Sequence, residues 1–388
     1  MPARYVSLAL DPVDGRPYIS YYDANYEGLR MAKYVGSGGN CGSNNNWECE
    51  LVDNDGNVGQ YSSIAIAPDG LPIIAYYDTT DGGALKLAIR RVFDWDIRTI
   101  DDLLLGSAGQ YASLAVNTNV RTGISYYHSN FIGNDSLWYA EYVGGGKGNC
   151  SDSDFDCEQV NYGDRVGKYT SLALDSTDRP HIAYYDGGID ALKYATYDGG
   201  WLYRWISTSQ GPAGQFASLA VDVNNGDRPH IAYYDSVNGT LKYAVYVGEG
   251  ADGNCGMSSS VQWEWRCVDI DSMGTGTHPR GISLALDKAG NPIIAYQTGA
   301  SGLKIARPAA AVGQLTGNCG PAVPFYTWQC DLISMGIGFG QGDHMSLAVN
   351  SAGLATLAYY GNSTEFAGDL RVAYQRLQLF LPLTLKKW

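Results

Sequence analysis

The chain has 388 residues, of which 26 are basic and 40 are acidic, so its formal net charge is −14. An acidic surface repels phosphate backbones, which argues against nucleic acid as a partner. No apolar run approaches the roughly 20 residues that a membrane helix needs, so we expect no membrane span. With 45% apolar residues and 30 tyrosines, the chain can fill a large folded core.

One motif, S-[LI]-A-[LIV], occurs seven times at intervals of 47 to 65 residues. A polar turn and an extended run such as YISYYD or HIAYYD follow each motif, and then a third run such as LKYAVYV. In six repeats a fourth segment follows, for example WECELVD. Each repeat therefore predicts three or four short antiparallel strands. The motif serines are Ser7, Ser63, Ser113, Ser171, Ser218, Ser283 and Ser346.

The strands of each repeat have a large apolar face and a small Ser/Ala face, as in the first motif strand, where Val6 and Leu8 alternate with Ser7. We expect the large face of one unit to pack on the small face of the next. Repeats of about 40–50 residues with four strands indicate a β-propeller, whereas a solenoid, the alternative, needs distinct capping repeats. We predict an all-β, seven-bladed β-propeller over residues 1–376, with blades starting near residues 4, 60, 110, 168, 215, 280 and 343.

In this repeat architecture, the chain resembles the seven-bladed propellers of secreted bacterial lectins and glycan-active enzymes. The resemblance covers residues 1–376 and lies in the repeated strand pattern. The sialidase Asp box, S-x-D-x-G-x-x-W, is absent, and so is the GH…WD pairing of WD40 repeats. The resemblance therefore assigns no catalytic residue.

The eight cysteines form four local pairs, each between the third and fourth segments of a repeat and each starting in a G-N-C triplet. Repeats with short connections there have no Cys, which predicts disulfides that clamp long loops, each worth about 2.5–3 kcal/mol. Zinc is disfavoured because no C-x-x-C spacing occurs and no His accompanies the pairs. The predicted disulfides are Cys41–Cys49, Cys150–Cys157, Cys255–Cys267 and Cys319–Cys330.

Four disulfides imply an oxidising compartment, so we expect a secreted, extracellular or cell-surface protein. Residues 1–15 show neither the basic nor the apolar region of a signal peptide, so we expect a leader to have been removed or to lie outside this sequence. An intracellular thermophile protein is the alternative. Four N-x-[ST] sequons are candidates for glycosylation: Asn134, Asn149, Asn238 and Asn362.

In a propeller, the loops that enter the first strand and leave the second open on one face. The residue three before the motif serine, the residue that ends the YYD run and the aromatic residues beside them should therefore lie together. Such a mixture of polar and aromatic side chains can bind sugar hydroxyls or a cation. The residues three before the motif serine are Arg4, Gln60, Gln110, Lys168, Gln215, Arg280 and Asp343. The residues that end the YYD run are Asp23, Asp78, His128, Asp186, Asp235, Thr298 and Gly361. The aromatic residues are Tyr5, Tyr61, Tyr111, Tyr169 and Phe216, with Gly281 and His344 at this position in the last two repeats.

Structural roles compete with these assignments. An Asp at a strand end usually caps the next turn, and we expect this for the four Asp. The motif serines are expected to pack and to form interblade hydrogen bonds. His181 and His230 share a repeat position with Ile73 and Ile293, so we interpret both as structural. The acidic run Asp152, Asp154 and Asp156 makes Ca²⁺ the one cofactor candidate, but it lacks the Gly and Glu of an EF-hand, which favours a solvated hairpin.

The motifs H-E-x-x-H, G-x-S-x-G and the Walker loop are missing, and no repeat carries an exceptional constellation. We therefore predict a non-catalytic extracellular propeller that acts as a surface, adhesion or recognition module, with a glycan or cell-surface ligand. The alternative is a carbohydrate-active enzyme or lectin that uses Asp and Tyr around the central funnel.

The last repeat has no Gly-rich hairpin after its third strand. We therefore expect blade 7 to lack its own outer strand and residues 377–388 to form a C-terminal tail or strand. The tail, or the open edge of blade 7, would then support self-association into a repeating structure. The alternative is that the tail folds back over its own blade.

Overall fold

The structure is a computed structural model. Every regular element among its described residues is a β-strand, except two short 3-10 turns, η1 (Thr80–Gly82) and η2 (Ala309–Val312). No helix in the described part of the chain is long and apolar enough to cross a membrane. The structure describes residues 3–103, 106–117, 121–130, 133, 135–207, 211–248, 253–256, 263–273, 281–298, 302–320, 328–334, 345–363, 366–376 and 379–384.

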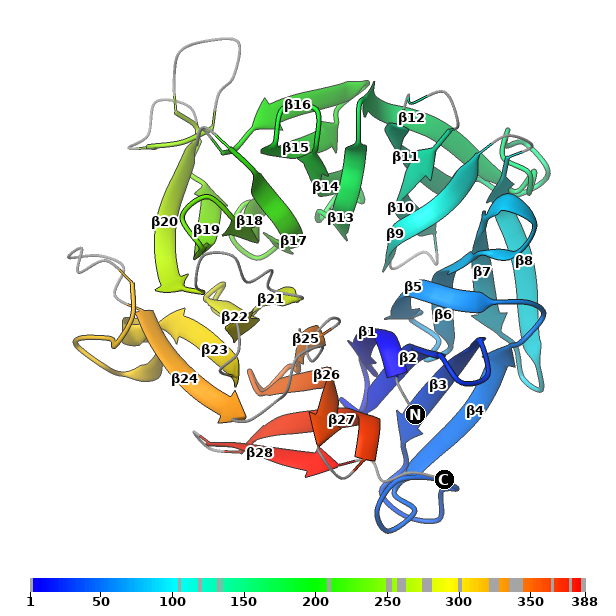
Figure 1. Cartoon of the computed structure of the whole chain (residues 1–388), viewed down its shortest axis with the longest axis horizontal. Helices are drawn as coiled ribbons and strands as arrows, with labels where there is room; N and C mark the ends of the chain where they lie inside the picture. The colour runs from blue at the N-terminus through cyan, green and yellow to red at the C-terminus, as the bar shows by residue number, and fades with distance from the viewer. Residues whose placement is uncertain are drawn as a thin grey trace. The chain divides into compact units, whose positions relative to one another are not determined.

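Backbone contacts divide the chain into two compact units, residues 1–167 with 343–388, and residues 168–342. The first unit holds four four-stranded antiparallel sheets, here called blades, each built from strands that follow one another in the chain (Figure 1). Blade 1 contains β1 (Ala3–Leu10), β2 (Pro17–Asp23), β3 (Gly28–Tyr34) and β4 (Trp47–Asp53); blade 2 contains β5 (Val58–Ile66), β6 (Pro72–Asp78), β7 (Ala84–Arg90) and β8 (Trp95–Asp102); blade 3 contains β9 (Ser107–Val116), β10 (Thr122–Ser129), β11 (Asp135–Tyr142) and β12 (Phe155–Gly163); blade 7 contains β25 (Met345–Val349), β26 (Ala355–Ser363), β27 (Phe366–Arg376) and β28 (Leu379–Thr384).

The second unit holds the other three blades, with the same strand order. Together the seven sheets confirm the predicted all-β, seven-bladed propeller, with four strands in every blade. Blade 4 contains β13 (Val166–Leu174), β14 (Pro180–Asp186), β15 (Ala191–Tyr197) and β16 (Trp201–Trp205); blade 5 contains β17 (Ala213–Asp222), β18 (Arg228–Asp235), β19 (Thr240–Tyr246) and β20 (Trp265–Ser272); blade 6 contains β21 (Ile282–Leu286), β22 (Pro292–Thr298), β23 (Gly302–Pro308) and β24 (Trp328–Ser334).

Blade 7 has its own fourth strand, so the expectation that it lacks one is wrong. Strand β28 pairs antiparallel with β27 throughout its length, with Pro382 opposite Ala373. Only two residues separate the two strands, and this short connection takes the place of the Gly-rich hairpin whose absence suggested an unpaired edge. The C-terminal tail therefore pairs with its own blade, as the alternative prediction held.

The hydrophobic core lies between successive blades. Leu29 and Met31 of blade 1 pack with Ile74 and Tyr76 of blade 2, and all four side chains are buried. Similar clusters join blades 2 and 3, 4 and 5, and 5 and 6. Large side chains of both blades meet in this cluster, which differs from the expectation that a large face packs on a small Ser/Ala face.

The motif serines form the predicted interblade hydrogen bonds. In each of these bonds, the residue after the motif serine of one blade donates its backbone N–H to the hydroxyl of the motif serine in the preceding blade. In the first unit Ile64 donates to Ser7 at 3.1 Å and Leu114 to Ser63 at 3.0 Å. In the second unit Leu219 donates to Ser171 and Leu284 to Ser218, both at 2.9 Å.

Candidate functional site

The first strand of a blade begins with a backbone irregularity that the sequence analysis missed. The aromatic residue two before the motif serine has φ between 52° and 56°, in the left-handed region, which costs a non-glycine residue about 1–2 kcal/mol. In blades 1, 2 and 5 the ladder register shifts at this point. The five residues are Tyr5, Tyr61, Tyr111, Tyr169 and Phe216.

In four of these five blades a glycine stands four residues before the motif serine, whereas blade 1 has Ala3 there. Gly109 has φ of 107°, and a Cβ there would lie 2.7 Å from Cα of Leu85 in the preceding blade. Gly59 and Gly214 have the same conformation and the same close approach to a leucine. The repeated G-[QK]-[YF] triplet was visible in the sequence, and it is the signal that could have identified this bulge.

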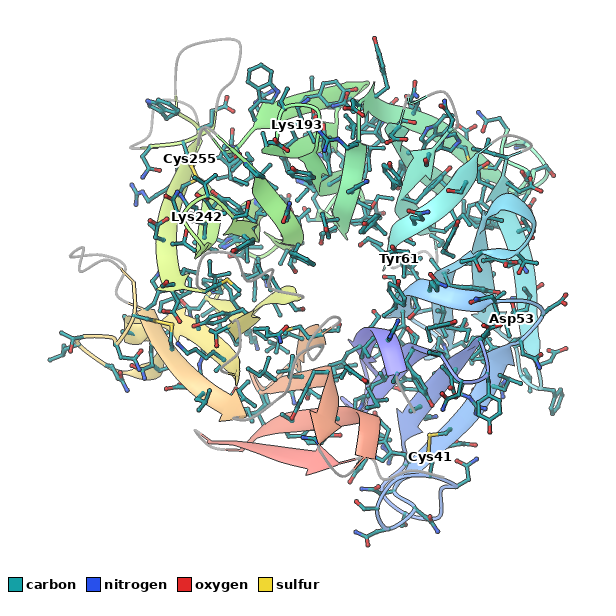
Figure 2. The ribbon with its side chains drawn as sticks, viewed as in Figure 1. Cys41, Asp53, Tyr61, Lys193, Lys242 and Cys255 are labelled. Carbon is teal, nitrogen blue, oxygen red and sulfur yellow. A yellow bond between two sulfur atoms is a disulfide. The ribbon has the colours of Figure 1, made fainter. Side chains whose placement is uncertain are left out.

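The strained backbone positions three half-buried aromatic rings of the first unit so that each ring contacts the next. We call these residues the tyrosine row: Tyr5, Tyr61 and Tyr111. The ring centroid of Tyr61 lies 4.5 Å from that of Tyr5 and 4.7 Å from that of Tyr111. Tyr61 is labelled in Figure 2. Burial and interactions with the other two tyrosines raise the pKa of Tyr61 far above its usual range. In the second unit, the rings of Tyr169 and Phe216 lie 4.6 Å apart.

The predicted polar residues at the start of the first strand lie beside the end of the second strand, as expected. Gln60 is opposite Tyr77 and Gln110 is opposite Tyr127. Nε2 of Gln60 donates to Asn57 at 3.4 Å. Gln110, Gln215 and Lys168 are half-buried and Arg4 is exposed, whereas Arg280, Asp343 and His344 lie outside the described residues.

The four Asp that end the second strands are buried and have the predicted capping role. One carboxylate oxygen accepts a backbone N–H of the next turn, as Asp78 does from Thr80 at 2.8 Å. The carboxylate also forms an ion pair with a cation on the third strand, which the sequence analysis missed. The pairs are Asp23–Arg30 at 2.9 Å, Asp78–Lys86 at 2.7 Å, Asp186–Lys193 at 2.6 Å and Asp235–Lys242 at 3.1 Å.

In two places, a carboxylate from the fourth strand of the preceding blade lies beside the third-strand lysine. The Tyr76 hydroxyl donates to Asp53 at 2.6 Å, and Lys86 lies 4.0 Å from the same carboxylate. Between blades 5 and 6, Tyr296 and Lys304 reach Asp271 at 2.6 and 2.7 Å, respectively. Each set of Asp, Tyr and Lys is called an interblade triad. Asp53 and the lysines of blades 4 and 5 are labelled in Figure 2.

Blade 3 departs from this pattern at two positions. His128 replaces the strand-end Asp, and Trp138 occupies the register position of the third-strand cation, opposite Tyr126. The two rings stack, with centroids 5.0 Å apart and an interplanar angle of 24°. Burial lowers the pKa of His128, although Asp101 and Asp135 act in the opposite direction.

His181 and His230 are structural, as interpreted from the sequence. Both are buried, and Nδ1 of each is hydrogen-bonded to a third-strand tyrosine hydroxyl, of Tyr194 and Tyr243 respectively. Those tyrosine rings in turn pack edge-on against Trp265 and Trp328 of the next blade. Burial lowers the pKa of His230 to about 4.

The acidic run in blade 3 forms an interblade ion-pair cluster. Arg98 of blade 2 lies 2.7 Å from Asp152 and 2.8 Å from Asp154. Hydrogen bonds from Arg98 and a backbone N–H hold the pKa of Asp154 below its usual value. Among the described residues, no group of three or more His, Cys, Asp or Glu could hold a metal ion.

All four predicted disulfides are present, and an asparagine clamp accompanies each. The Asn of the G-N-C triplet accepts the backbone N–H of the second Cys and donates to its carbonyl, at 2.7 and 2.9 Å for Asn40 and Cys49. Gly39 is required because a Cβ there would lie 2.0 Å from the Trp47 carbonyl oxygen. The equivalent clamps use Asn149, Asn254 and Asn318.

Two of the four sequon asparagines lie among residues whose side chains are described. The amide of Asn149 forms the clamp on Cys157, and that of Asn238 donates to Asp235 at 2.9 Å. Both amide nitrogens therefore already serve the fold. Asn134 and the side chain of Asn362 lie outside the described part of the chain.

No family model matches this sequence, and no curated protein matches it. Among solved structures, the BP39L lectin from Burkholderia pseudomallei is similar over 99% of both chains, at 13% identity and a TM-score of 0.63. A puromycin-hydrolyzing peptidase from Mycobacterium tuberculosis is similar over 97% of this chain and 52% of that chain, at 10% identity and a TM-score of 0.53. The Hadza microbial sialidase Hz136 is similar over 77% of this chain and 64% of that chain, at 12% identity and a TM-score of 0.50. These likenesses show the propeller fold.

Proposed function

We propose that this protein is an extracellular, non-catalytic propeller that recognises glycans through the tyrosine row. The observation that carries the proposal is the strained backbone: three tyrosines in one row are held with φ near +54°, although the fold could place a glycine there at no steric cost. Strain of this kind is retained where the side chain it positions has a use. Half-buried tyrosine rings give a rigid apolar surface with polar edges, which suits sugar rings.

The neighbouring groups support binding rather than catalysis. Gln60 and Gln110 lie in the strand segments next to the row and have amide groups that can bind sugar hydroxyls. The strand-end carboxylates that a glycosidase would need are used in turn caps and ion pairs. The four disulfides support an extracellular location, and a surface or adhesion role follows from glycan recognition there.

A glycan array probed with the purified protein tests the proposal. Tyr61→Asn removes the ring, and Asn tolerates the left-handed conformation, so the fold should persist. We expect at least a tenfold loss of affinity for any glycan bound on the array. Tyr162→Asn is the matched control because Tyr162 is an exposed tyrosine on β12.

The proposal fails if the array shows no binding, or if Tyr61→Asn and Tyr111→Asn both bind as the wild type does. Release of reducing sugar from a bound glycan would instead support the alternative, a carbohydrate-active enzyme.

Self-association through the C-terminal strand also remains a proposal. Because β28 pairs with β27, the edge available for strand addition belongs to β28 itself. Removal of residues 379–388 should convert any oligomer to a monomer in light-scattering measurements. A wild-type chain that stays monomeric at high concentration would rule this out.

A further inference from the structure

The rings of the tyrosine row lie closer to one another than to the tyrosines behind them. The ring centroid of Tyr61 is 4.5 Å from that of Tyr5 and 4.7 Å from that of Tyr111, with interplanar angles of 50° and 46°. The second-strand tyrosines Tyr22 and Tyr77 meet Tyr5 and Tyr61 edge-on, each at 6.2 Å. A centroid separation at the short end of the range for aromatic pairs brings ring carbons of the two residues into van der Waals contact.

The hydroxyl ends of the row also meet. The Tyr61 hydroxyl is hydrogen-bonded to the hydroxyls of Tyr5 and Tyr111. Behind the row, the Tyr22 hydroxyl instead donates to Asn57 at 2.9 Å. The ring carbons ortho to a hydroxyl lie directly beside it, so the ortho carbons of neighbouring row tyrosines lie close together. Ortho carbons are the positions at which two tyrosyl radicals join by a C–C bond.

The backbone and the burial of the row hold these contacts in place. Tyr5, Tyr61 and Tyr111 have φ of 54°, 52° and 56°, in the left-handed region. Their side chains are half-buried, whereas a surface tyrosine such as Tyr162 is 73% exposed. A radical formed in the row is therefore in contact with a tyrosine of its own chain before it meets one of another molecule.

The disulfides do not provide covalent bonds between blades. Each of the four spans 7 to 12 residues, in the connection between the third and fourth strands of one blade. A bond between Tyr5 and Tyr61 would instead join two blades across 56 positions, and one between Tyr61 and Tyr111 across 50. In the chain-entropy model, a bond that closes a longer loop stabilises the folded state more.

We infer that the tyrosine row is a site of oxidative cross-linking, where Tyr61 forms a dityrosine bond with Tyr5 or Tyr111 and joins blade 2 covalently to blade 1 or blade 3. Each phenol loses one electron and its hydroxyl proton, a C–C bond forms between two ortho carbons, and the hydrogens of those carbons move to the oxygens to restore both phenols. Hydrogen peroxide, used by a peroxidase-type catalyst, takes up the two electrons and two protons and is reduced to two waters. The inference goes beyond glycan recognition and does not depend on it.

The repeat itself supplies matched variants. In blade 5 the row position holds Phe216, whose ring lies 4.6 Å from that of Tyr169 at an interplanar angle of 47°. Phe216 has φ of 55°, so a phenylalanine fits this strained position. Tyr61→Phe should therefore keep the packing and remove only the phenol. Phe216→Tyr should conversely place a second phenol against Tyr169.

Treatment of the purified full chain with peroxidase and limiting hydrogen peroxide, followed by digestion and mass spectrometry, tests the inference. We expect a monomer lighter by two hydrogens and a peptide pair that links Tyr61 to Tyr5 or Tyr111. Tyr61→Phe should lose this link, whereas Tyr162→Phe, the surface control, should keep it. A monomer of unchanged mass, under conditions that convert N-acetyltyrosine amide to its dimer in a parallel mixture, would overturn the inference. So would a monomer whose cross-links exclude Tyr61.

Two further measurements test the geometry and its effect. Phe216→Tyr should gain a new link between Tyr169 and position 216, and failure to gain it under conditions that cross-link Tyr61 would contradict the role of ring contact. After reduction of the disulfides, cross-linked wild-type protein should melt at a higher temperature than untreated protein, because two blades remain joined. Equal melting temperatures would contradict the inference that the bond joins blades.

Discussion

The Ser346 hydroxyl accepts a hydrogen bond of 2.9 Å from the backbone N–H of Leu8, 338 positions earlier in the chain. The same contact joins Ser7 to Ile64 and Ser63 to Leu114 within the first unit. Buried residues of blades 7 and 1, including Val372 and Val6, form one apolar cluster around it. Blade 7 therefore packs on blade 1 as any blade in this unit packs on the next.

We predict that Ser346→Ala destabilises the protein by about 1–3 kcal/mol, because the N–H of buried Leu8 loses its acceptor. Hydrogen exchange should accelerate at Leu8. The matched variant Ser63→Ala should instead accelerate exchange at Leu114 and leave Leu8 protected. Unchanged protection of Leu8 in Ser346→Ala would show that this contact contributes nothing to the association of blades 7 and 1.

Gly109, two residues before Tyr111 of the tyrosine row, should tolerate no side chain. Gly109→Ala places a Cβ 2.7 Å from Cα of Leu85, and backbone cannot yield as a flexible side chain would. Gly70→Ala is the control, because Gly70 also has positive φ but has no atom within 4 Å of the added carbon. Urea unfolding should show Gly109→Ala to be less stable than Gly70→Ala by about 2 kcal/mol. Equal destabilisation would mean that strain in φ alone limits both positions.

Acid should destabilise the protein partly through His230. Its folded-state pKa is about 4, below the value of about 6.5 expected when unfolded. Between these values the unfolded chain binds more protons, so the free energy of unfolding falls as pH decreases from 6.5 towards 4. The contribution of His230 to the free energy of unfolding is fully present above pH 6.5 and amounts to at most about 3 kcal/mol.

The double variant His230→Ile/Tyr243→Ile, which copies Ile293 and Ile305 of blade 6, should reduce this pH dependence. Urea unfolding at pH 7 and pH 5 measures the difference. Identical pH slopes for wild type and variant would indicate that other groups control the acid sensitivity.

The disulfides should be detectable by mass spectrometry, and their reduction should lower the melting temperature only modestly. Intact oxidised protein should be about 8 Da lighter than the reduced chain, since each of its eight cysteines loses one hydrogen. Reduction should lower the melting temperature without unfolding the blades, because each bond closes a short loop while the core lies between blades. Eight free thiols in native protein would contradict both the pairing and the argument for an oxidising compartment.

The periodic features of the fold could be predicted from the sequence, because repetition makes them visible. Seven copies of one motif led to seven blades, and the paired cysteines to four disulfides. The interblade hydrogen bonds of the motif serines were predicted because a small polar residue recurs in the middle of each first strand. The last strand was missed because β28 follows a two-residue connection and contains Pro382, which looked unfavourable for pairing.

The details of the candidate site depend on contacts between repeats, which alternation along one strand does not reveal. The left-handed tyrosines follow from a bulge against the preceding blade, for which Gly59 and Gly109 were the available signal. The lysines of the third strands were visible as a repeated LK pair, but their partners come from another strand or another blade. Trp138 stands at the same position in the sequence of blade 3, but only the structure shows that its ring stacks on that of His128.

The four described strands of every blade follow one another in a single stretch of sequence. Among the described strands, β1 is the first strand of blade 1 and β28 is the fourth strand of blade 7. The step from blade 7 back to blade 1 thus has the same form as the step from β4 to β5 across residues 54–57. A chain opened between β4 and β5, with a linker from the end of β28 to the start of β1, would therefore hold the same seven sheets, each in one continuous stretch and beginning from blade 2.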